Sequence, residues 1–456
     1  MSLKRLASAA AVAVLALGSY AMADDGQMSG GQSADPTQIA LSSPVVNPVT
    51  LDDTTAPSTE AAAAAPAASA PSETTSTPLM YLIGNTGVGQ WLSNNKFNIT
   101  GFVEGGYFID TNNPNLGTGS NGDSPTYVTF PGAYSNRVLL DQLDLTIEKT
   151  LDTTKKWDWG FLFENGYGTD DSYTHSHGML DNAPPGQPQN QYDILQANIS
   201  FYLPVGTGLT VTAGKFVAYL GDEVINPTGN LFFTHSYSFF YAIPATNTGI
   251  MASYTFPKLV NGNDWTFSGG ITNGWNQSLR DNNSAIDFLG QAKGNITSSL
   301  NLLFNIEEGP EATDNESDYW TALELIPSWT VSDQLTVTGD LVYVDAPGDS
   351  ATNPGSAAQW YGAVGYVHYQ LTSMFAPNFR IEWYRDQGAA TTGNQANYYE
   401  ATFGVQVKPL PNDNIFQWLQ IRPEIRGDFA DRRVYNVSHG GDYSELTCAV
   451  DVIMQF

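Results

Sequence analysis

The 456-residue chain is poor in several features on which other proteins depend. It contains a single cysteine, Cys448, so an intrachain disulfide is excluded. Only 14% of its residues are charged, and 18 Lys and Arg stand against 46 Asp and Glu. Because phosphate binding needs Lys and Arg, this deficit argues against nucleic acid as a partner.

Long apolar runs and catalytic motifs are also missing. Beyond residue 23 no run of 18 apolar residues occurs, which excludes a membrane-spanning helix there. Such a chain can cross a membrane only as a closed β-barrel. The sequence lacks Gly-x-Ser-x-Gly and His-Glu-x-x-His. We therefore expect no enzyme activity, no cofactor and no metal site.

The first 95 residues differ in composition from the rest. Residues 1–23 predict a signal peptide, with a basic start, a short apolar run and an Ala-Met-Ala cleavage site. Residues 24–78 are rich in Ala, Pro, Ser and Thr and predict a disordered periplasmic linker. Residues 79–95 regain apolar side chains and predict a short periplasmic segment, with one short helix at the barrel mouth.

The last residues of the chain carry a clear strand pattern. Leu446, Cys448 and then Val450, Val452, Met454 and Phe456 occupy every second position, opposite a mostly polar row. Period 2 is the strand period, so one face is apolar and the other mostly polar. A terminal strand that finishes on an aromatic residue is typical of bacterial outer-membrane barrels, and these last four residues are the expected barrel-closure signal.

The same alternation recurs upstream. Between residues 96 and 456 we count sixteen strands, separated by alternately short and long gaps, as in an antiparallel transmembrane β-barrel. Fourteen or eighteen strands remain open alternatives. Seven of the eight lysines after residue 23 fall at the ends joined by short gaps, which we assign to the periplasm: Lys96, Lys149, Lys155, Lys156, Lys258, Lys293 and Lys408.

Several stretches resemble the putative β-barrel porin family of the OmpL-like type. They are Asn136–Gln142 running to Lys149, Phe163–Asp170, Gln196–Gly206, Gly214–Phe216, Glu223–Asn230 and Ser236–Tyr241. The resemblance spans residues 96–456 and lies in the order of the motifs. It implies an outer-membrane barrel with a pore role, and it supplies no ligand residues.

One long gap is unusually apolar. Residues 218–246 begin near Asp222 and Glu223, turn at Asn226–Gly229 and continue with seven aromatic or histidine residues. Exposed apolar patches are costly or are binding sites, so we expect this loop to fold into the lumen and narrow it. Packing on the rim or on a neighbouring protomer is the alternative. Inward folding makes Asp222 and Glu223 candidate constriction carboxylates.

The alternation also orients charged wall residues. It places Arg380 and, on a later strand, Arg422 and Arg426 on the inner face. These arginines could form a basic strip that opposes the loop carboxylates and selects solutes by charge. The alternative is that they only neutralise Glu382, Glu424 and Asp428. The acidic excess of the chain predicts a weak cation preference.

Metal chemistry has two weak candidates. His175 and His177 lie in a predicted outer loop, but two loop histidines without a third ligand are usually solvated. The acidic stretch from Asp314 to Asp318 could hold Ca²⁺ loosely, although it lacks an EF-hand pattern.

We therefore expect an outer-membrane porin for passive diffusion of small hydrophilic solutes. The alternative is a structural outer-membrane protein with a plugged barrel, tethered to the cell wall by its linker; an outer-membrane enzyme is a third hypothesis. The expected partners are outer-membrane lipid, small hydrophilic solutes or ions, the barrel assembly machinery and, by analogy with porins, two further copies in a homotrimer.

Overall fold

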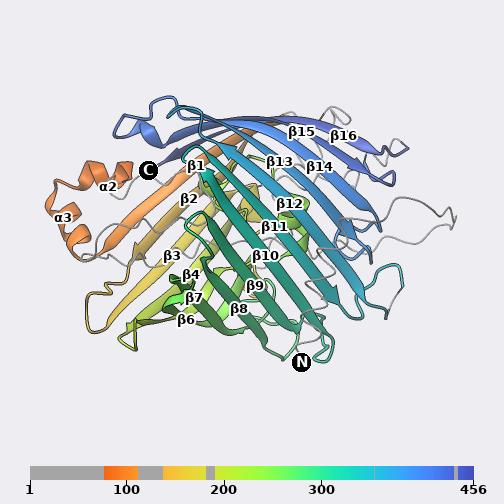
Figure 1. Cartoon of the computed structure of the whole chain (residues 1–456), viewed down its shortest axis with the longest axis horizontal. Helices are drawn as coiled ribbons and strands as arrows, with labels where there is room; N and C mark the ends of the chain where they lie inside the picture. The colour runs from red at the N-terminus through yellow and green to blue at the C-terminus, as the bar shows by residue number, and fades with distance from the viewer. Residues whose placement is uncertain (1–76, 111–136, 181–189, 354, 436–439) are drawn as a thin grey trace. The chain divides into compact units, whose positions relative to one another are not determined.

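A computed structural model describes residues 77–110, 137–180, 190–353, 355–435 and 440–456. The predicted signal peptide and nearly all of the predicted linker lie outside these residues. Sixteen antiparallel strands form one closed barrel in which each strand pairs with its neighbours in the chain (Figure 1). The predicted fold class and the count of sixteen are confirmed.

The strands lie in the part of the chain, residues 96–456, where the sequence predicts them. Their bounds are β1 Phe97–Asp110, β2 Val138–Lys149, β3 Asp158–Gly168, β4 Gln191–Leu203, β5 Leu209–Val217, β6 Thr246–Val260, β7 Asn263–Thr272, β8 Asp287–Asn295, β9 Leu300–Pro310, β10 Tyr319–Ser332, β11 Leu335–Ala346, β12 Ala358–Tyr369, β13 Phe375–Asp386, β14 Asn397–Val407, β15 Leu419–Ala430 and β16 Ser444–Gln455.

The barrel closes where the sequence predicts. β16 pairs with β15 on one side and with β1 on the other, where Val452 lies opposite Gly105. Phe456 extends the ladder, because its backbone N–H donates to the Gly101 oxygen at 2.8 Å and its oxygen accepts from the Gly101 N–H at 3.0 Å. Closure leaves no unpaired strand edge, which a membrane-spanning sheet requires.

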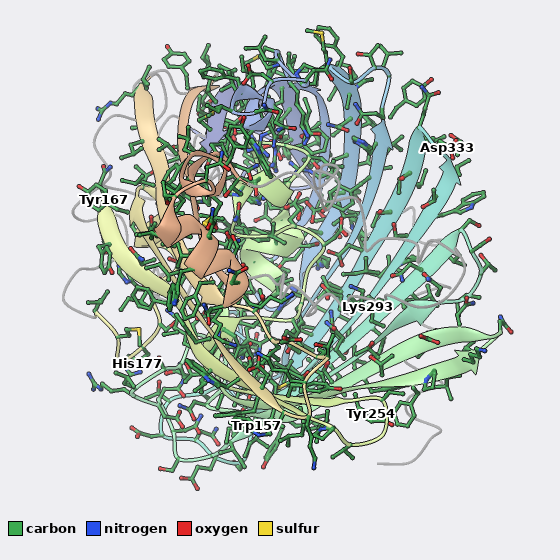
Figure 2. The ribbon with its side chains drawn as sticks, turned by 90° about the vertical axis from the view of Figure 1, so that its left-hand side faces the viewer. Trp157, Tyr167, His177, Tyr254, Lys293 and Asp333 are labelled. Atoms are coloured by element: carbon green, nitrogen blue, oxygen red, sulfur yellow. The ribbon has the colours of Figure 1, made fainter. Side chains whose placement is uncertain are left out.

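Aromatic side chains gather near both ends of the strands on the outer face. Near the short turns, Tyr254 packs edge-on against Phe256 with ring centroids 4.7 Å apart, and Trp157 is exposed. Figure 2 looks onto this end, with Trp157, Tyr254 and Asp333 around its rim. Near the long loops the Tyr361 ring packs edge-on against the Trp383 ring, with centroids 5.4 Å apart. Two such belts are typical of barrels that sit between two membrane interfaces.

Two helices precede the barrel, where the sequence predicted one. α2 (Pro78–Ile83) and α3 (Gly87–Asn94) are separate because Thr86 caps the second, its hydroxyl accepting from the Gly89 N–H at 3.0 Å. The Trp91 ring stacks on Phe97 of β1, with centroids 5.4 Å apart. None of the helices in the described residues is both long enough and apolar enough to cross a membrane.

Candidate functional site

The candidate site is the loop between β5 and β6, residues 218–245, hereafter the inner loop. Its two ends meet, since the Ala218 N–H donates to the Ala245 oxygen at 3.0 Å. None of its residues is exposed, and most are buried. It contains two short helical turns, η4 (Pro227–Gly229) and η5 (Ser238–Ala242). The predicted inward folding of this loop agrees with its contacts to the inner wall.

Local side-chain contacts shape the first half of the inner loop. Asn226 starts η4, because its side chain accepts from the Thr228 N–H at 3.0 Å and proline follows it. The Asn230 amide then closes the turn by accepting from the Val224 N–H at 2.8 Å and donating to the Val224 oxygen at 2.6 Å. This segment is therefore a closed turn, and its Ile225 backbone oxygen accepts a hydrogen bond from the Gln142 side chain of β2 at 3.0 Å.

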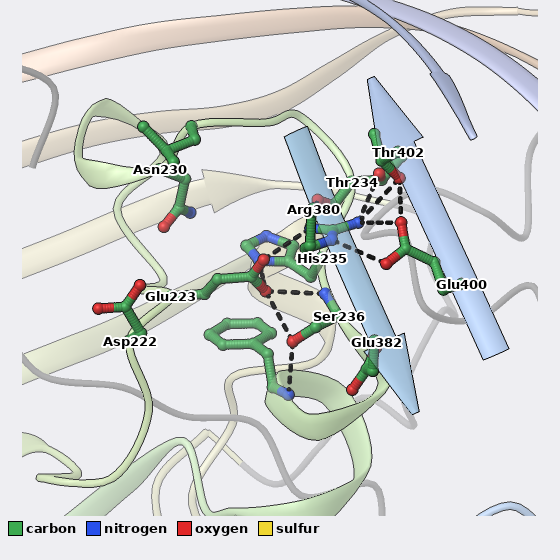
Figure 3. Close-up of polar contacts among 12 residues, drawn as sticks. Asp222, Glu223, Asn230, Thr234, His235, Ser236, Arg380, Glu382, Glu400 and Thr402 are labelled. Atoms are coloured by element: carbon green, nitrogen blue, oxygen red, sulfur yellow. Dashed lines mark hydrogen bonds and ion pairs between the residues drawn. The ribbon is translucent and has the colours of Figure 1, made fainter. Parts of the chain in front are cut away.

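Strand β13 holds the middle of the inner loop through two inward charges (Figure 3). Arg380 donates to Glu223 Oε1 at 2.6 Å and to the Thr234 backbone oxygen at 2.6 Å. Its Nε donates to Glu400 of β14 at 3.1 Å. Two positions later, Glu382 accepts from the Ser238 N–H at 2.7 Å and also from the backbone of residue 237 at 2.6 Å. On this strand, therefore, the arginine donates a hydrogen bond to a backbone oxygen of the inner loop, and the glutamate accepts hydrogen bonds from backbone N–H groups of the inner loop.

Strand β15 repeats the pattern. Arg422 donates to the backbone oxygens of Pro227 and Asn230, both at 2.8 Å. Glu424 accepts from the Phe233 N–H at 2.8 Å. Arg426 donates to the backbone oxygen of residue 235. Arginine and glutamate alternate at every second position, so all of these side chains lie on the inner face.

The alternating arginines and glutamates of β13 and β15 provide hydrogen-bond partners for the buried backbone of the inner loop. An irregular loop cannot pair all of its own N–H and C=O groups, and each buried unpaired group costs about 1–3 kcal/mol. Wall carboxylates on two further strands extend the solution, because Glu324 of β10 accepts from the Gly221 N–H at 2.8 Å and Asp340 of β11 accepts from the Asp222 N–H at 3.2 Å. The wall and the inner loop are therefore complementary group by group.

Aromatic packing completes the contact. Tyr237 is fully buried, with its ring 5.0 Å from Tyr398 and 6.1 Å from Tyr384 between centroids. Its hydroxyl donates to Asp428 at 2.9 Å. A side chain at Gly362 of β12 would overlap the Ser238 hydroxyl, so the wall leaves room for η5 there.

The carboxylates of the inner loop differ in electrostatics. Burial alone would raise the pKa of Glu223, but the Arg380 guanidinium outweighs it, helped by His235, and holds that pKa at about 2. Burial outweighs the Glu223 charge and leaves the pKa of His235 below its ordinary value, so the imidazole is neutral at pH 7. Burial and the nearby Asp340 and Glu223 charges raise the pKa of Asp222.

Glu223 gives a pH prediction. Its pKa falls from the ordinary 4.5 to about 2 on folding, so the pair with Arg380 stabilises the fold fully above about pH 4.5 and loses this contribution as the pH falls toward 2. We expect the difference in free energy of unfolding between the wild type and Glu223→Gln to be constant from pH 8 to 5 and to shrink below that. Urea unfolding followed by tryptophan fluorescence measures it, and a difference that is unchanged at pH 3 would contradict the pairing.

The structure places the predicted site residues together, but not as an open strip. Arg380, Arg422 and Arg426 are on the inner face, at most 1% exposed, and covered by the inner loop. Glu223 pairs with Arg380, whereas the Asp222 carboxylate is half-buried without an ion pair in the described residues. Of the three neutralising partners that the sequence offered, Asp428 pairs with Arg426 at 2.8 Å.

The other two arginines have different partners. Arg380 also pairs with Glu400, and Arg422 pairs with Glu104 at 3.1 Å and with Asp451. Glu382 and Glu424 bind the inner-loop backbone instead. These arginines are therefore anchors of the inner loop, because full burial denies them contact with a solute in this structure. A role of the five predicted residues in a constriction stays a prediction.

The two loop histidines point to different partners. His175 Nε2 lies 2.6 Å from the Gln191 amide oxygen, and His177 Nδ1 lies 3.0 Å from that of Gln277. Neither contact brings the two rings to one centre.

Three carboxylates that the sequence pattern did not single out do converge. Asp287, Glu307 and Glu311 are buried, and one oxygen of each lies within 4.8 Å of the others. Glu307 and Glu311 are four positions apart, which is a period-2 signal of a shared face. The register that brings Asp287 to them could not be read from the sequence.

Comparison with known families adds to this geometry. The profile of the family described as putative beta-barrel porin-2, OmpL-like, matches residues 96–456, the whole barrel. The chain belongs to this family. Membership in the porin-2 family, with the closed barrel, places the protein in the outer membrane and indicates a porin-type channel rather than an enzyme.

Solved porin structures are similar to this porin-2 chain at low identity. An anion-selective porin from Comamonas acidovorans is 10% identical, with a TM-score of 0.49, over 79% of this chain and 99% of that one. OmpF of Salmonella typhi, in complex with daunomycin, is 14% identical, with a TM-score of 0.48, over 79% and 98%. OprB of Pseudomonas putida is 12% identical, with a TM-score of 0.48, over 81% and 96%. No curated protein matches the sequence.

Proposed function

We propose that this protein is a porin through which small hydrophilic solutes diffuse passively, with a weak cation preference and with the inner loop narrowing the lumen. The observation that carries the proposal is the polar inner face of the barrel. Hydroxyl pairs line it on β4 to β7: Ser200 with Thr212 at 2.8 Å, Ser253 with Ser268 at 2.7 Å and Thr255 with Thr266 at 2.9 Å. Half-buried hydroxyls suit a water-filled passage, whereas a solid core would be apolar.

Charge balance supports the cation preference. The three wall arginines pair with five carboxylates, namely Glu104, Glu223, Glu400, Asp428 and Asp451. Their positive charge is thus neutralised by carboxylates of the wall and of the inner loop. The half-buried Glu148 on the inner face of β2 remains for a passing ion. Asp222 on the inner loop joins it at a pH above the raised pKa of that carboxyl.

Conductance in a planar bilayer tests the channel itself. We expect purified full-length protein to give stepwise ion currents. The absence of any step in a preparation that shows a folded barrel by circular dichroism would reject the porin and favour the plugged barrel.

Ion selectivity tests the charge assignment. In a KCl gradient we expect the reversal potential to show a permeability for K⁺ above that for Cl⁻. The double variant Glu148→Gln with Asp222→Asn should move the reversal potential toward zero. The matched control is Asp333→Asn, at the tip of the turn between β10 and β11, outside the lumen (Figure 2). An equal shift in the control, or no shift in the double variant, would contradict the assignment.

A second candidate function is a structural protein with a plugged barrel. The many hydrogen bonds from the wall to the inner loop favour this function, because a loop held at so many points is expected to be a rigid plug. Its tether would be residues 24–78, and a pull-down of peptidoglycan by the full chain but not by a chain without these residues would support it. A homotrimer and help from the barrel assembly machinery stay predictions, and chemical cross-linking in native membranes tests the first.

A further inference from the structure

A cluster of carboxylates lies on a part of the wall that carries none of the arginine anchors. Glu307 and Gly309 face inward on β9, and Glu311 comes directly after that strand. In the β8–β9 register Leu289 lies opposite Glu307, which brings Asp287 opposite Gly309. A side chain at Gly309 would overlap the Asp287 carboxylate, so the glycine makes room for it. Asp287 therefore sits between the two glutamates.

A neutral side chain joins the cluster from β6. Asn247 is fully buried, and its amide nitrogen donates to Glu307 Oε1 at 2.6 Å. Its amide oxygen accepts no hydrogen bond from the described residues, and the same holds for Glu307 Oε2 and Asp287 Oδ2. Buried polar atoms are rarely left without a partner, so these three oxygens lack a donor or a cation.

Nothing in the described protein supplies that charge. No Lys, Arg or His among these residues forms an ion pair with Asp287, Glu307 or Glu311. Glu311 accepts the Trp275 backbone N–H, at 3.0 and 3.1 Å, and this donor carries no net charge. Burial, and then the Asp287 charge, raise the pKa of Glu311, as expected for a carboxyl that lacks a cation.

We propose that Asp287, Glu307, Glu311 and the Asn247 amide oxygen bind one divalent cation, with Ca²⁺ preferred. The donors are all oxygens, and three are carboxylates, which is the ligand chemistry of a hard cation. Ca²⁺ accepts irregular arrangements at about 2.4 Å per oxygen, and oxygens up to about 4.8 Å apart can then share one ion. Mg²⁺ demands a near-ideal octahedron and keeps most of its waters, which suits this enclosed cluster less well.

The cation would join elements that the barrel ladder connects only indirectly. It would link β6 and the residues around Trp275 to β8 and β9. The Trp275 ring packs edge-on against Trp320 at 5.6 Å, and Trp320 packs against Trp360 at 5.3 Å. Trp360 donates to the Ala242 oxygen of the inner loop at 3.2 Å. The bound ion would thus stiffen the support of the inner loop from the side without arginine anchors.

Terbium luminescence provides a direct test, because Tb³⁺ replaces Ca²⁺ at oxygen sites and is excited by a nearby indole such as that of Trp275. We expect full-length protein in detergent to give a saturable Tb³⁺ signal of one ion per chain that Ca²⁺ displaces at lower concentration than Mg²⁺ does. Glu307→Gln and Asp287→Asn each keep the side-chain shape and remove one charge. Each should weaken Ca²⁺ competition at least about tenfold, since ligand charge sets affinity.

The matched control changes the exposed acidic residues of the adjacent loop, Asp314→Asn with Glu316→Gln. This control should leave the Tb³⁺ signal and its displacement unchanged. No saturable signal in wild-type protein, or a signal that survives both site variants, would overturn the proposal. Circular dichroism and resistance to unfolding in cold detergent show whether each variant forms the barrel, and Glu311→Gln provides a third site variant if one does not.

Discussion

Replacing residues 221–243 with a short Gly-Ser turn should raise the single-channel conductance several-fold. The inner loop is hydrogen-bonded to the inner faces of β2 and β15, and in the proposed porin it narrows the lumen. Conductance grows with the open cross-section. The replacement is practicable because the Ala218 N–H and the Ala245 oxygen already meet at 3.0 Å. The wall arginines left behind keep carboxylate partners, since Arg422 retains Asp451 and Arg426 retains Asp428. Glu382 and Glu424 lose their inner-loop donors and would be hydrated by the water that replaces the loop.

The control for this deletion is a long loop with exposed residues. Replacing residues 312–317, between β9 and β10, by the same turn should leave the conductance near the wild-type value. If the inner-loop deletion conducts no more than the wild type, the loop does not limit the current. A wild type that is silent beside a deletion that conducts would instead establish the plugged barrel.

Arg380→Ala should cost about 3–5 kcal/mol of unfolding free energy. The substitution leaves Glu223 and Glu400 buried without a cation and removes the donor to the Thr234 oxygen. Removing one member of a buried, hydrogen-bonded pair is costly because the partner charge stays behind, away from water. Urea unfolding in lipid vesicles, followed by tryptophan fluorescence, measures the loss.

Arg385→Ala, five residues along the same strand, is the control. Arg385 lies 4.0 Å from Asp431, and both side chains reach solvent, so the pair should contribute at most about 1 kcal/mol. Similar losses in the two variants would mean that the Arg380 contacts add no more than a surface ion pair.

The barrel itself was predictable because strand signals are local. Rows such as Trp159, Phe161 and Phe163 reveal period 2 without knowledge of any partner, and short and long gaps then order the strands. The inward orientation of Arg380 and Arg422 follows from the same alternation of inward and outward side chains. The two helices were predicted as one because the Thr86 cap divides an otherwise continuous apolar stretch.

The contacts of each inward residue were not predictable. Arg380 and Glu223 are 157 positions apart, and their meeting depends on how the inner loop turns. The convergence of Asp287 with Glu307 depends on the β8–β9 register, in which a shift by one residue would send every side chain of the shifted strand to the opposite face. The alternation along a strand tells which face of the barrel a residue occupies. Strand register and loop geometry decide which other side chains it contacts.

The wall strands that hold the inner loop have a consequence for the order of assembly. Residues 218–245 take most of their hydrogen-bond partners from β10, β11, β13 and β15, which lie later in the chain. Until those strands have joined the growing sheet, the loop has no complementary surface and its backbone stays in water. Docking is therefore a late folding event that fills an interior already enclosed, and water must leave as the loop enters.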